Sequence, residues 1–252
     1  MSLPDITLYL LSESKTRPMA KILMIISAAD TLTLADGSTH PTGYWAEEVT
    51  ASHKVLTEAG HTVRIATPGG ARPTVDAISL DERGGVDAAD AAGFQAYLES
   101  INTDLAAPLD LAAVRAADYE ALYLPGGHAP MADLADDARL GALLAEADHR
   151  GQVIAALCHG VAGLLSATKE DGTFVFAGRS LTGFTDEEEK QGGLGDQAPW
   201  LVESRLTQRG ADVRTGAAWS DTVIVDGNLI TGQNPQSSVT TAKQVLAALP
   251  DA

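Results

Sequence analysis

The sequence has a single cysteine, Cys158, among its 252 residues, and this scarcity excludes an intrachain disulfide. One unpaired thiol is typical of a reducing compartment, so we expect a cytoplasmic protein. No apolar stretch approaches the ~20 residues that span a bilayer, so we expect no membrane partner. Aromatic residues make up only 5% of the chain, which gives little support for the large exposed apolar surface of a chaperone.

Basic residues are also scarce, because 17 Lys and Arg stand against 34 Asp and Glu, a formal net charge of −17. Binding to nucleic acid needs clustered Lys and Arg, so we expect no such partner. An anionic membrane surface is disfavoured for the same reason. The glycine-rich motifs of nucleotide binding are missing, and no spacing of His, Cys and acidic residues indicates a metal site. We therefore expect neither a metal nor another cofactor.

The first 18 residues contain a short apolar stretch without a basic start or a cleavage site. We interpret 1–18 as an extension or tag-like segment rather than a signal peptide. Residues 19–252 show no linker and no internal repeat, and the chain is 45% hydrophobic, which is enough for one large core. We predict a single domain over 19–252.

Apolar runs alternate with helical patterns, which predicts an α/β fold with a mostly parallel sheet covered on both faces. Strands are predicted at 21–27, 61–66, 119–124, 153–157, 174–176 and 180–184, and a hairpin at 222–231. Helices are predicted at 43–60, 88–101, 133–151, 161–165, 201–210 and 237–249, the last capped by Ser237. The segment 71–118 is interpreted as a small helical excursion from the sheet, and 28–42 as a polar loop.

The stretch 153–165 reads VIAALCHGVAGLL and places the cysteine where a buried strand meets a helix. Such a turn brings Cys158 to the free N–H groups of the helix, which lower the pKa of a thiol. The alternative is a small buried hydrophobe, a common role for a lone cysteine. Ligands bind at the carboxyl ends of parallel strands, where Cys158, the pair Gly126-Gly127 and the 28–42 loop all fall. We therefore predict that Cys158 is catalytic.

A thiolate that attacks a carbonyl needs backbone N–H groups beside the developing negative charge. His159, directly after the cysteine, supplies one candidate donor. Gly127, next to Gly126, supplies the second, although an ordinary turn also explains the two glycines. His159 is either the base for the cysteine or a turn residue. No other histidine follows Cys158, so the downstream His-x-Glu of a glutamine amidotransferase is missing.

Five segments match a known pattern: 43–48 (GYWAEE), 124–128 (LPGGH), 156–160 (ALCHG), 181–185 (LTGFT) and 231–235 (TGQNP). Together they resemble the PfpI / parkinsonism-associated deglycase superfamily. They look most like its branch of glutathione-independent glyoxalase III enzymes and related heat-shock chaperones. The resemblance implies a class I glutamine-amidotransferase-like domain with a flavodoxin-like, three-layer sandwich. It also implies a catalytic pair of Cys158 with His159, and a homodimer.

The resemblance further implies a glutamate from the first helix that touches the thiol, and by register Glu48 matches it better than Glu47. It implies a third acidic residue within 186–189, for which we take Glu189. We interpret the rest of that acidic run as a solvated helix start. A carboxylate beside a thiolate raises the thiol pKa. Glu48 must therefore be protonated, or move a proton during turnover.

These residues lead to one hypothesis and two alternatives. Cys158 attacks a small aldehyde such as methylglyoxal, and Glu48 and His159 move protons through an enediol, so that lactate leaves without metal or glutathione. A glycated adduct is a related substrate. An intracellular cysteine peptidase or amidase is the first alternative. A stress chaperone or a redox sensor without turnover, using the oxidation of Cys158, is the second.

Overall fold

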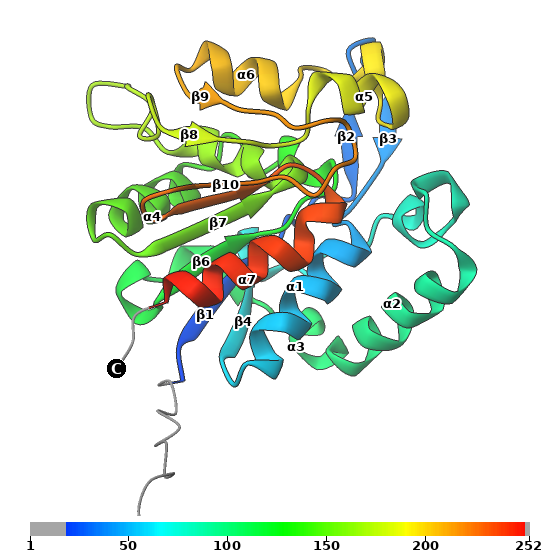
Figure 1. The fold of residues 1–252 in the computed structure, drawn as a ribbon, viewed down its shortest axis with the longest axis horizontal. Coiled ribbons are helices and arrows are strands. Elements are labelled where there is room, and N and C mark those ends of the chain that lie inside the picture. The colour runs from blue at the N-terminus through cyan, green and yellow to red at the C-terminus, as the bar shows by residue number, and fades with distance from the viewer. Residues whose placement is uncertain (1–18, 250–252) are drawn as a thin grey trace, which may run out of the picture.

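A seven-stranded sheet lies at the centre of the fold, between helices that cover both of its faces (Figure 1). The computed structural model describes residues 19–249, so the extension predicted at 1–18 lies outside the described residues. The strand order is β10-β11-β7-β6-β1-β4-β5, and every neighbouring pair is parallel except β10 with β11. The predicted α/β fold with a mostly parallel sheet is confirmed.

The elements have the following bounds. The central strands are β1 (Lys21–Ile25), β4 (Thr62–Thr67), β5 (Leu109–Asp110), β6 (Ala121–Leu124), β7 (Val153–Leu157), β10 (Val223–Asp226) and β11 (Leu229–Gly232). Two small pairs are β2 (Thr31–Thr33) with β3 (Thr39–Pro41), and β8 (Ser180–Leu181) with β9 (Asp212–Val213). The α-helices are α1 (Ala46–Glu58), α2 (Ala88–Ser100), α3 (Asn102–Ala106), α4 (Ala138–His149), α5 (Asp186–Gly192), α6 (Val202–Gln208) and α7 (Ser238–Ala248).

Short 3₁₀ helices connect these elements. They are η1 (Pro68–Gly70), η2 (Ala77–Leu80), η3 (Glu82–Gly84), η4 (Leu111–Ala113), η5 (Ala116–Asp118), η6 (Ala129–Met131), η7 (Cys158–Ser166), η8 (Gly195–Gln197) and η9 (Pro235–Ser237). None of the helices within residues 19–249 is long and apolar enough to cross a membrane.

The sheet separates two apolar cores, because side chains alternate between the faces of a strand. In β1, Leu23 and Ile25 pack into one core together with residues of α4, η7 and α6. Ile22 and Met24 pack into the other core with residues of α1, α2 and α7. Burial on both faces explains why β1, β6 and β7 have almost continuous apolar sequences.

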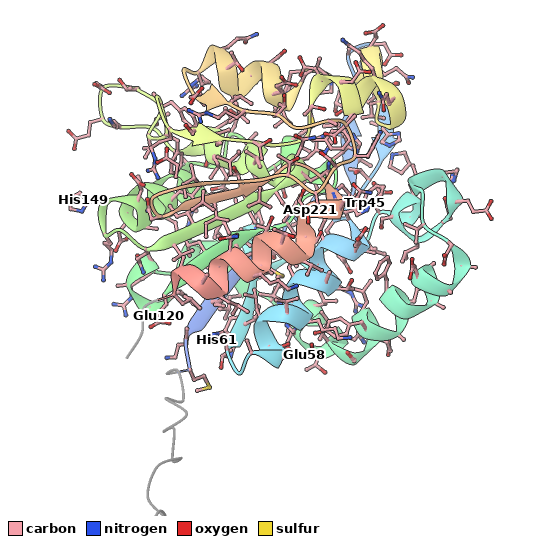
Figure 2. All side chains as sticks on the ribbon, viewed as in Figure 1. Trp45, Glu58, His61, Glu120, His149 and Asp221 are labelled. Carbon is pink, nitrogen blue, oxygen red and sulfur yellow. The ribbon has the colours of Figure 1, made fainter. Side chains whose placement is uncertain are left out.

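The carboxyl ends of β6 and β7 meet at one edge of the sheet, next to the start of α1. Figure 2 shows Trp45, which directly precedes α1, at this edge. Glu58 ends α1 and Glu120 precedes β6, and both lie at the opposite edge (Figure 2). The predicted grouping of Cys158 with Gly126-Gly127 therefore forms at the edge where ligands bind in parallel sheets.

The segment after Cys158 differs from its prediction, because η7 is a 3₁₀ helix and not an α-helix. Its glycines allow an unusually close approach to β6. A Cβ at Gly160 would lie 2.3 Å from the carbonyl oxygen of Leu124, and one at Gly163 would lie 2.7 Å from the Leu124 side chain. Glycine has low helix propensity, and this tight packing favours the narrower helix.

Two strands predicted between 174 and 184 are wrong or too long. Phe174 makes one isolated bridge, to Thr168, and the following residues form turns. Phe174 and Phe176 are nevertheless buried in the core. Their apolar character thus reflects core packing and not strand pairing. The next strand, β8, has only the two residues Ser180–Leu181.

Three smaller expectations are also corrected. The polar loop at 28–42 contains the antiparallel pair β2–β3, and the excursion at 71–118 returns to the sheet as the edge strand β5. Ser237 precedes α7 but makes no capping hydrogen bond, because its backbone is already helical at the end of η9. Its hydroxyl instead donates to Asn234 and to the carbonyl of Thr222. The helices α1, α2, α4, α6 and α7 lie within their predicted segments, and the β10–β11 hairpin extends one residue beyond its predicted segment, to Gly232.

Candidate active site

Cys158 lies at the turn between β7 and η7 in a backbone conformation that side chains other than glycine rarely adopt. Its φ is 54°, in the left-handed region. Strain of this kind persists only where the surroundings hold it, and it is concentrated at functional sites. Cys158 is 3% exposed, so the turn holds the thiol at the floor of a cavity and not on the open surface.

The two glycines after β6 are required by close packing around the cysteine. A Cβ at Gly126 would lie 2.6 Å from the backbone nitrogen of Gly160 and 2.8 Å from that of His159. Gly127 has φ of 92°, and its Cβ would lie 2.3 Å from the carbonyl oxygen of Gly43. An ordinary turn does not need glycine at both positions, so these residues allow three backbone segments to meet at the thiol.

The backbone N–H groups of His159 and Gly127 both act on the sulfur of Cys158 and lower the pKa of the thiol. These are the two residues that the sequence indicates as donors for a developing negative charge. The structure brings both N–H groups to the reactive atom, from η7 and from the end of β6.

Glu48 projects from α1 to the same place and is completely buried. Its Oε2 accepts a hydrogen bond of 2.6 Å from the backbone N–H of Gly126. Its Oε1 has no hydrogen-bond partner of regular geometry among the described residues, although the carboxyl lies close enough to Cys158 for each group to shift the pKa of the other. Burial raises the pKa of Glu48 to about 8.

Glu47, the neighbouring candidate, faces a different environment. It lines the cavity. Burial, together with the charge of Asp90, raises its pKa to about 7. The structure therefore places Glu48, and not Glu47, beside Cys158.

The pKa of the Cys158 thiol is raised well above its usual value, which contradicts the expectation that the turn lowers it. Burial is the largest cause, followed by the nearby Glu48 carboxyl, while the two backbone N–H groups offset only part of the increase. The resting cysteine is thus a neutral thiol.

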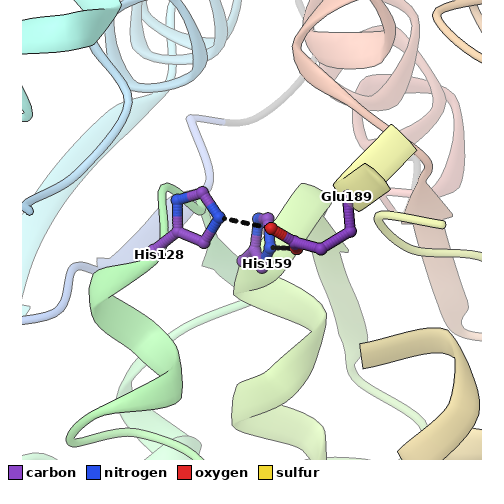
Figure 3. A group of neighbouring side chains, drawn as sticks. All are labelled: His128, His159 and Glu189. Carbon is purple, nitrogen blue, oxygen red and sulfur yellow. Dashed lines mark hydrogen bonds and ion pairs between the residues drawn. The ribbon is translucent and has the colours of Figure 1, made fainter. Parts of the chain in front are cut away.

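His159 lies between the thiol of Cys158 and Glu189 of α5, and Figure 3 shows its contact with Glu189. Its Nδ1 lies 3.4 Å from the sulfur of Cys158. Its Nε2 lies 2.7 Å from Oε2 of Glu189. Glu189 is therefore the acidic residue of the 186–189 run that orients the histidine, as the resemblance implies.

Burial and the neighbouring His128 lower the pKa of His159, against the opposite effect of Glu189. Burial alone would raise the pKa of Glu189, but His159 and His128 outweigh it and hold that pKa well below its usual value. The lowered pKa of His159 and the lowered pKa of Glu189 are both consistent with a neutral imidazole that donates Nε2–H to an ionised carboxylate. Nδ1 is then free to accept the proton of the thiol.

The acidic run at 186–189 is less solvated than expected, because only Glu187 is exposed. Asp186 accepts hydrogen bonds from Ser204. Glu188 is fully buried and forms a capping box with Thr185 at the start of α5. This cap fixes the register of α5, so that the next residue, Glu189, points at the two histidines.

His128 is a member of the site that the residue-by-residue reasoning missed. Its Nε2 lies 3.0 Å from Oε1 of Glu189, and its ring centre lies 4.1 Å from that of His159 (Figure 3). The signal was present, because His128 follows Gly126-Gly127 at the same sheet edge as the cysteine. A histidine at that edge is a candidate site residue for the same reason as the two glycines.

His128, His159 and Glu189 offer ligand atoms within 4.8 Å of one another, a grouping that could hold a metal ion. The sequence did not indicate it, because the three residues come from three separate elements and have no regular spacing. Hydrogen bonds also join both histidines to Glu189, so the same three residues can act as a hydrogen-bonded relay.

A cavity of about 330 Å³ opens above the thiol. Its lining is partly glycine and partly aromatic: Trp45, Glu47, Arg83, Gly84, Gly85, Val86, Gly127, His128, Cys158, His159, Phe184, Gly192, Gly193, Trp219, Pro235 and Gln236. A cavity of this size with a few convergent polar groups is typical of a site for small molecules.

Comparison with known proteins gives a consistent family. The sequence profile of the DJ-1/PfpI family matches residues 41–248. A bovine glutamine amidotransferase-like class 1 domain-containing protein 1 is 31% identical over 191 residues, which cover 76% of this chain and 82% of the relative. A glutathione-independent glyoxalase of Saccharomyces cerevisiae is 33% identical over 54% of this chain and 60% of the relative. Glyoxalase 3 of Candida albicans is 26% identical over 91% and 98%.

Solved structures show the same fold over nearly the whole chain. Rapid Encystment Protein 24 kDa of Francisella tularensis superposes with a TM-score of 0.82 at 28% identity, and covers 92% of this chain and 100% of its own. Glyoxalase III of Candida albicans superposes with a TM-score of 0.77 at 24% identity, over 92% and 98% of the two chains.

Proposed function

The chain belongs to the DJ-1/PfpI family, and from this premise we propose that it is a cysteine-dependent enzyme that converts small α-oxoaldehydes such as methylglyoxal into 2-hydroxy acids. Glyoxalase names among its relatives support this reaction class. Early glycation adducts of the same aldehydes are a related substrate, since they present the same carbon to the thiol.

One observation carries the proposal, namely the buried Glu48 beside the thiol. A pKa of about 8 leaves this carboxyl mostly protonated at neutral pH. A protonated carboxyl does not repel a sulfur anion, and its unpaired Oε1 is free to hold the proton. An acid of this pKa can give up and take back a proton near neutral pH, which is the task of an isomerisation catalyst.

The first step forms a bond between the sulfur of Cys158 and the aldehyde carbon. The thiol proton passes to Nδ1 of His159, 3.4 Å away, and the aldehyde oxygen becomes an alkoxide. The N–H groups of His159 and Gly127, which lower the pKa of the thiol in the free protein, can stabilise that charge. The protonated Glu48 then gives its proton to the alkoxide, which yields a neutral hemithioacetal and leaves Glu48 as a carboxylate and His159 as an imidazolium.

The second step is an internal oxidation and reduction that needs no external electron acceptor. The hydrogen on the sulfur-bearing carbon moves to the adjacent carbonyl carbon, and the hydroxyl hydrogen moves from one oxygen to the other. The hemithioacetal thereby becomes a thioester of a 2-hydroxy acid. The Glu48 carboxylate left by the first step takes the carbon-bound hydrogen as a proton and returns it to the adjacent carbon, since the sulfur-bearing carbon is one bond from the sulfur. The imidazolium of His159 gives its proton to the carbonyl oxygen and then takes the hydroxyl proton from the other oxygen.

Water then hydrolyses the thioester, which releases the hydroxy acid and restores the thiol. Glu189 stabilises the charged imidazole whenever His159 holds an extra proton, through the hydrogen bond of 2.7 Å. The whole sequence adds one water to the oxoaldehyde and leaves the enzyme unchanged.

The test is the formation of lactate from methylglyoxal, without glutathione, by the wild type and by Cys158→Ser. We expect turnover by the wild type and a loss of at least about 10³-fold in the variant, because a hydroxyl is a far weaker nucleophile than a thiolate. Peptide and amide substrates are assayed with the same samples. Turnover of methylglyoxal that survives in Cys158→Ser would contradict the proposal, as would cleavage of peptides without lactate formation.

A further inference from the structure

The cavity above Cys158 is larger than methylglyoxal requires. Methylglyoxal has five heavy atoms, whereas cavities of about 300 Å³ and above take drug-sized ligands. The cavity holds about 330 Å³. It therefore leaves room for a larger substrate, with its aldehyde at the sulfur and its remaining atoms against the far walls.

Those walls are aromatic on one side. The ring of Phe184 lies 4.4 Å from that of His159, centre to centre, and the ring of Trp219 lies 5.6 Å from Phe184 at an interplanar angle of 70°. The three rings form a continuous series from the catalytic histidine to the rim.

The position of Trp219 is imposed by its surroundings and not by its own preference. Among the described residues other than glycine, two have a positive φ, and they are Cys158 at 54° and Trp219 at 63°. Both line the same cavity. Backbone strain at a bulky residue persists only where several contacts enforce it.

Those contacts come from the helix that carries Glu189. The backbone N–H of Trp219 donates to Oε1 of Glu188, at 2.7 Å, and its indole Nε1–H donates to Gln191, also at 2.7 Å. Gly192 provides the space for the ring, since a Cβ there would lie 3.0 Å from the indole. Although the residue is 37% exposed, the ring is therefore held over the cavity.

We infer that Trp219 and Phe184 form a subsite for an aromatic or bulky apolar substituent, so that arylglyoxals such as phenylglyoxal are better substrates than methylglyoxal. Phenylglyoxal has ten heavy atoms, twice as many as methylglyoxal, and is still a small ligand for a cavity of about 330 Å³. Its phenyl ring can pack edge to face against the two aromatic side chains. This inference rests on the proposed function, because it names the substrate class of that site.

The kinetic test compares kcat/KM for phenylglyoxal and methylglyoxal. We expect a ratio above about ten for the wild type, and a fall of the ratio by about tenfold in Trp219→Ala, because the aromatic contact is lost. Trp219→Gly is a second variant, which removes the ring but relieves the positive φ, so that a folding defect in the alanine variant cannot hide the result. Trp200→Phe, outside the cavity lining, is the matched control and should leave the ratio unchanged.

A binding test separates this inference from the proposed function. Mandelate and lactate, the hydroxy acids that correspond to the two aldehydes, carry the same charge and differ in the ring. We expect mandelate to bind about tenfold more tightly in isothermal titration calorimetry, and Trp219→Gly to remove the difference. This measurement requires no turnover.

The outcomes are distinct. Equal kcat/KM for both aldehydes, with equal binding of mandelate and lactate, overturns the subsite and leaves the proposed function intact. No turnover of either aldehyde, with tighter binding of mandelate that depends on Trp219, supports the subsite and overturns the proposed function. A preference for phenylglyoxal that persists in both Trp219 variants overturns the assignment to this residue.

Discussion

Two buried glutamates flank the reactive cysteine and its histidine, and their protonation differs although their burial is similar. Glu48, on the α1 side, meets one backbone N–H and a thiol, and burial raises its pKa to about 8. Glu189, on the α5 side, meets two imidazoles, and they hold its pKa well below the usual value despite burial. Partners and not depth therefore decide which carboxyl carries a proton. The raised pKa favours the protonated form of Glu48, and the lowered pKa favours the ionised form of Glu189.

The strongest test of this difference is Glu48→Gln, which keeps the shape of the side chain but cannot exchange a proton. We expect kcat for methylglyoxal to fall by about 10²–10⁴-fold, the usual range for a lost acid-base group. The thiol should become easier to ionise, because the nearby carboxyl no longer raises its pKa. Alkylation of Cys158 by iodoacetamide, followed against pH, measures that change. Slower alkylation at every pH would contradict the assignment.

The two glutamates should also affect stability with opposite signs. The folded pKa of Glu48 lies above the unfolded value of 4.5, so its stabilising effect is complete below pH 4.5 and is lost as pH rises to about 8. The pKa of Glu189 is depressed, so its contribution is present above pH 4.5 and is lost as pH falls below that value.

Urea unfolding between pH 3 and 9 measures both effects. In the wild type we expect the free energy of unfolding to fall by a few kcal/mol, at most about 5, between pH 4.5 and 8 because of Glu48. In Glu48→Gln this fall should be absent. In Glu189→Gln the free energy of unfolding should instead rise less than in the wild type as the pH increases from 3 to 4.5. The same pH dependence in both variants would show that the two carboxyls do not differ in protonation.

The smallest expected effect belongs to His128, which acts through Glu189 and His159 as a positioning residue. In His128→Gln we expect kcat/KM to fall by about tenfold, since one of the partners of Glu189 is weakened. His128 also lowers the pKa of His159, so the acidic limb of the pH–rate profile should move to higher pH. A uniform loss of activity with an unchanged pH profile would indicate a purely structural role.

The parts of the fold that depend on long apolar runs could be predicted from the sequence. The strands β1, β6 and β7 are buried on both faces, and burial of this kind leaves continuous apolar segments. Their carboxyl ends then place Cys158 and Gly126-Gly127 together. Short elements such as β5 and β8 have two residues each, and no pattern of two residues distinguishes a strand from a turn.

The site was less predictable, because its properties arise from neighbours that are distant in sequence. His128 and His159 share Glu189, which lies 61 and 30 residues away from them. The direction of the thiol pKa depends on burial and on Glu48, and neither is visible in the local sequence around Cys158. The turn alone therefore predicts the wrong direction for the pKa of the Cys158 thiol.

Glu188 connects α5 to the loop that carries Trp219. One carboxyl oxygen accepts hydrogen bonds from Trp219, Gln233 and Asn234, and the other accepts from Thr185. The loop at 214–222 is thus attached to α5 through Glu188, next in the chain to Glu189, and through Gln191. Grafting a different loop onto this anchor, with Glu188 retained, would be a way to engineer new substrate ranges without altering the reacting groups.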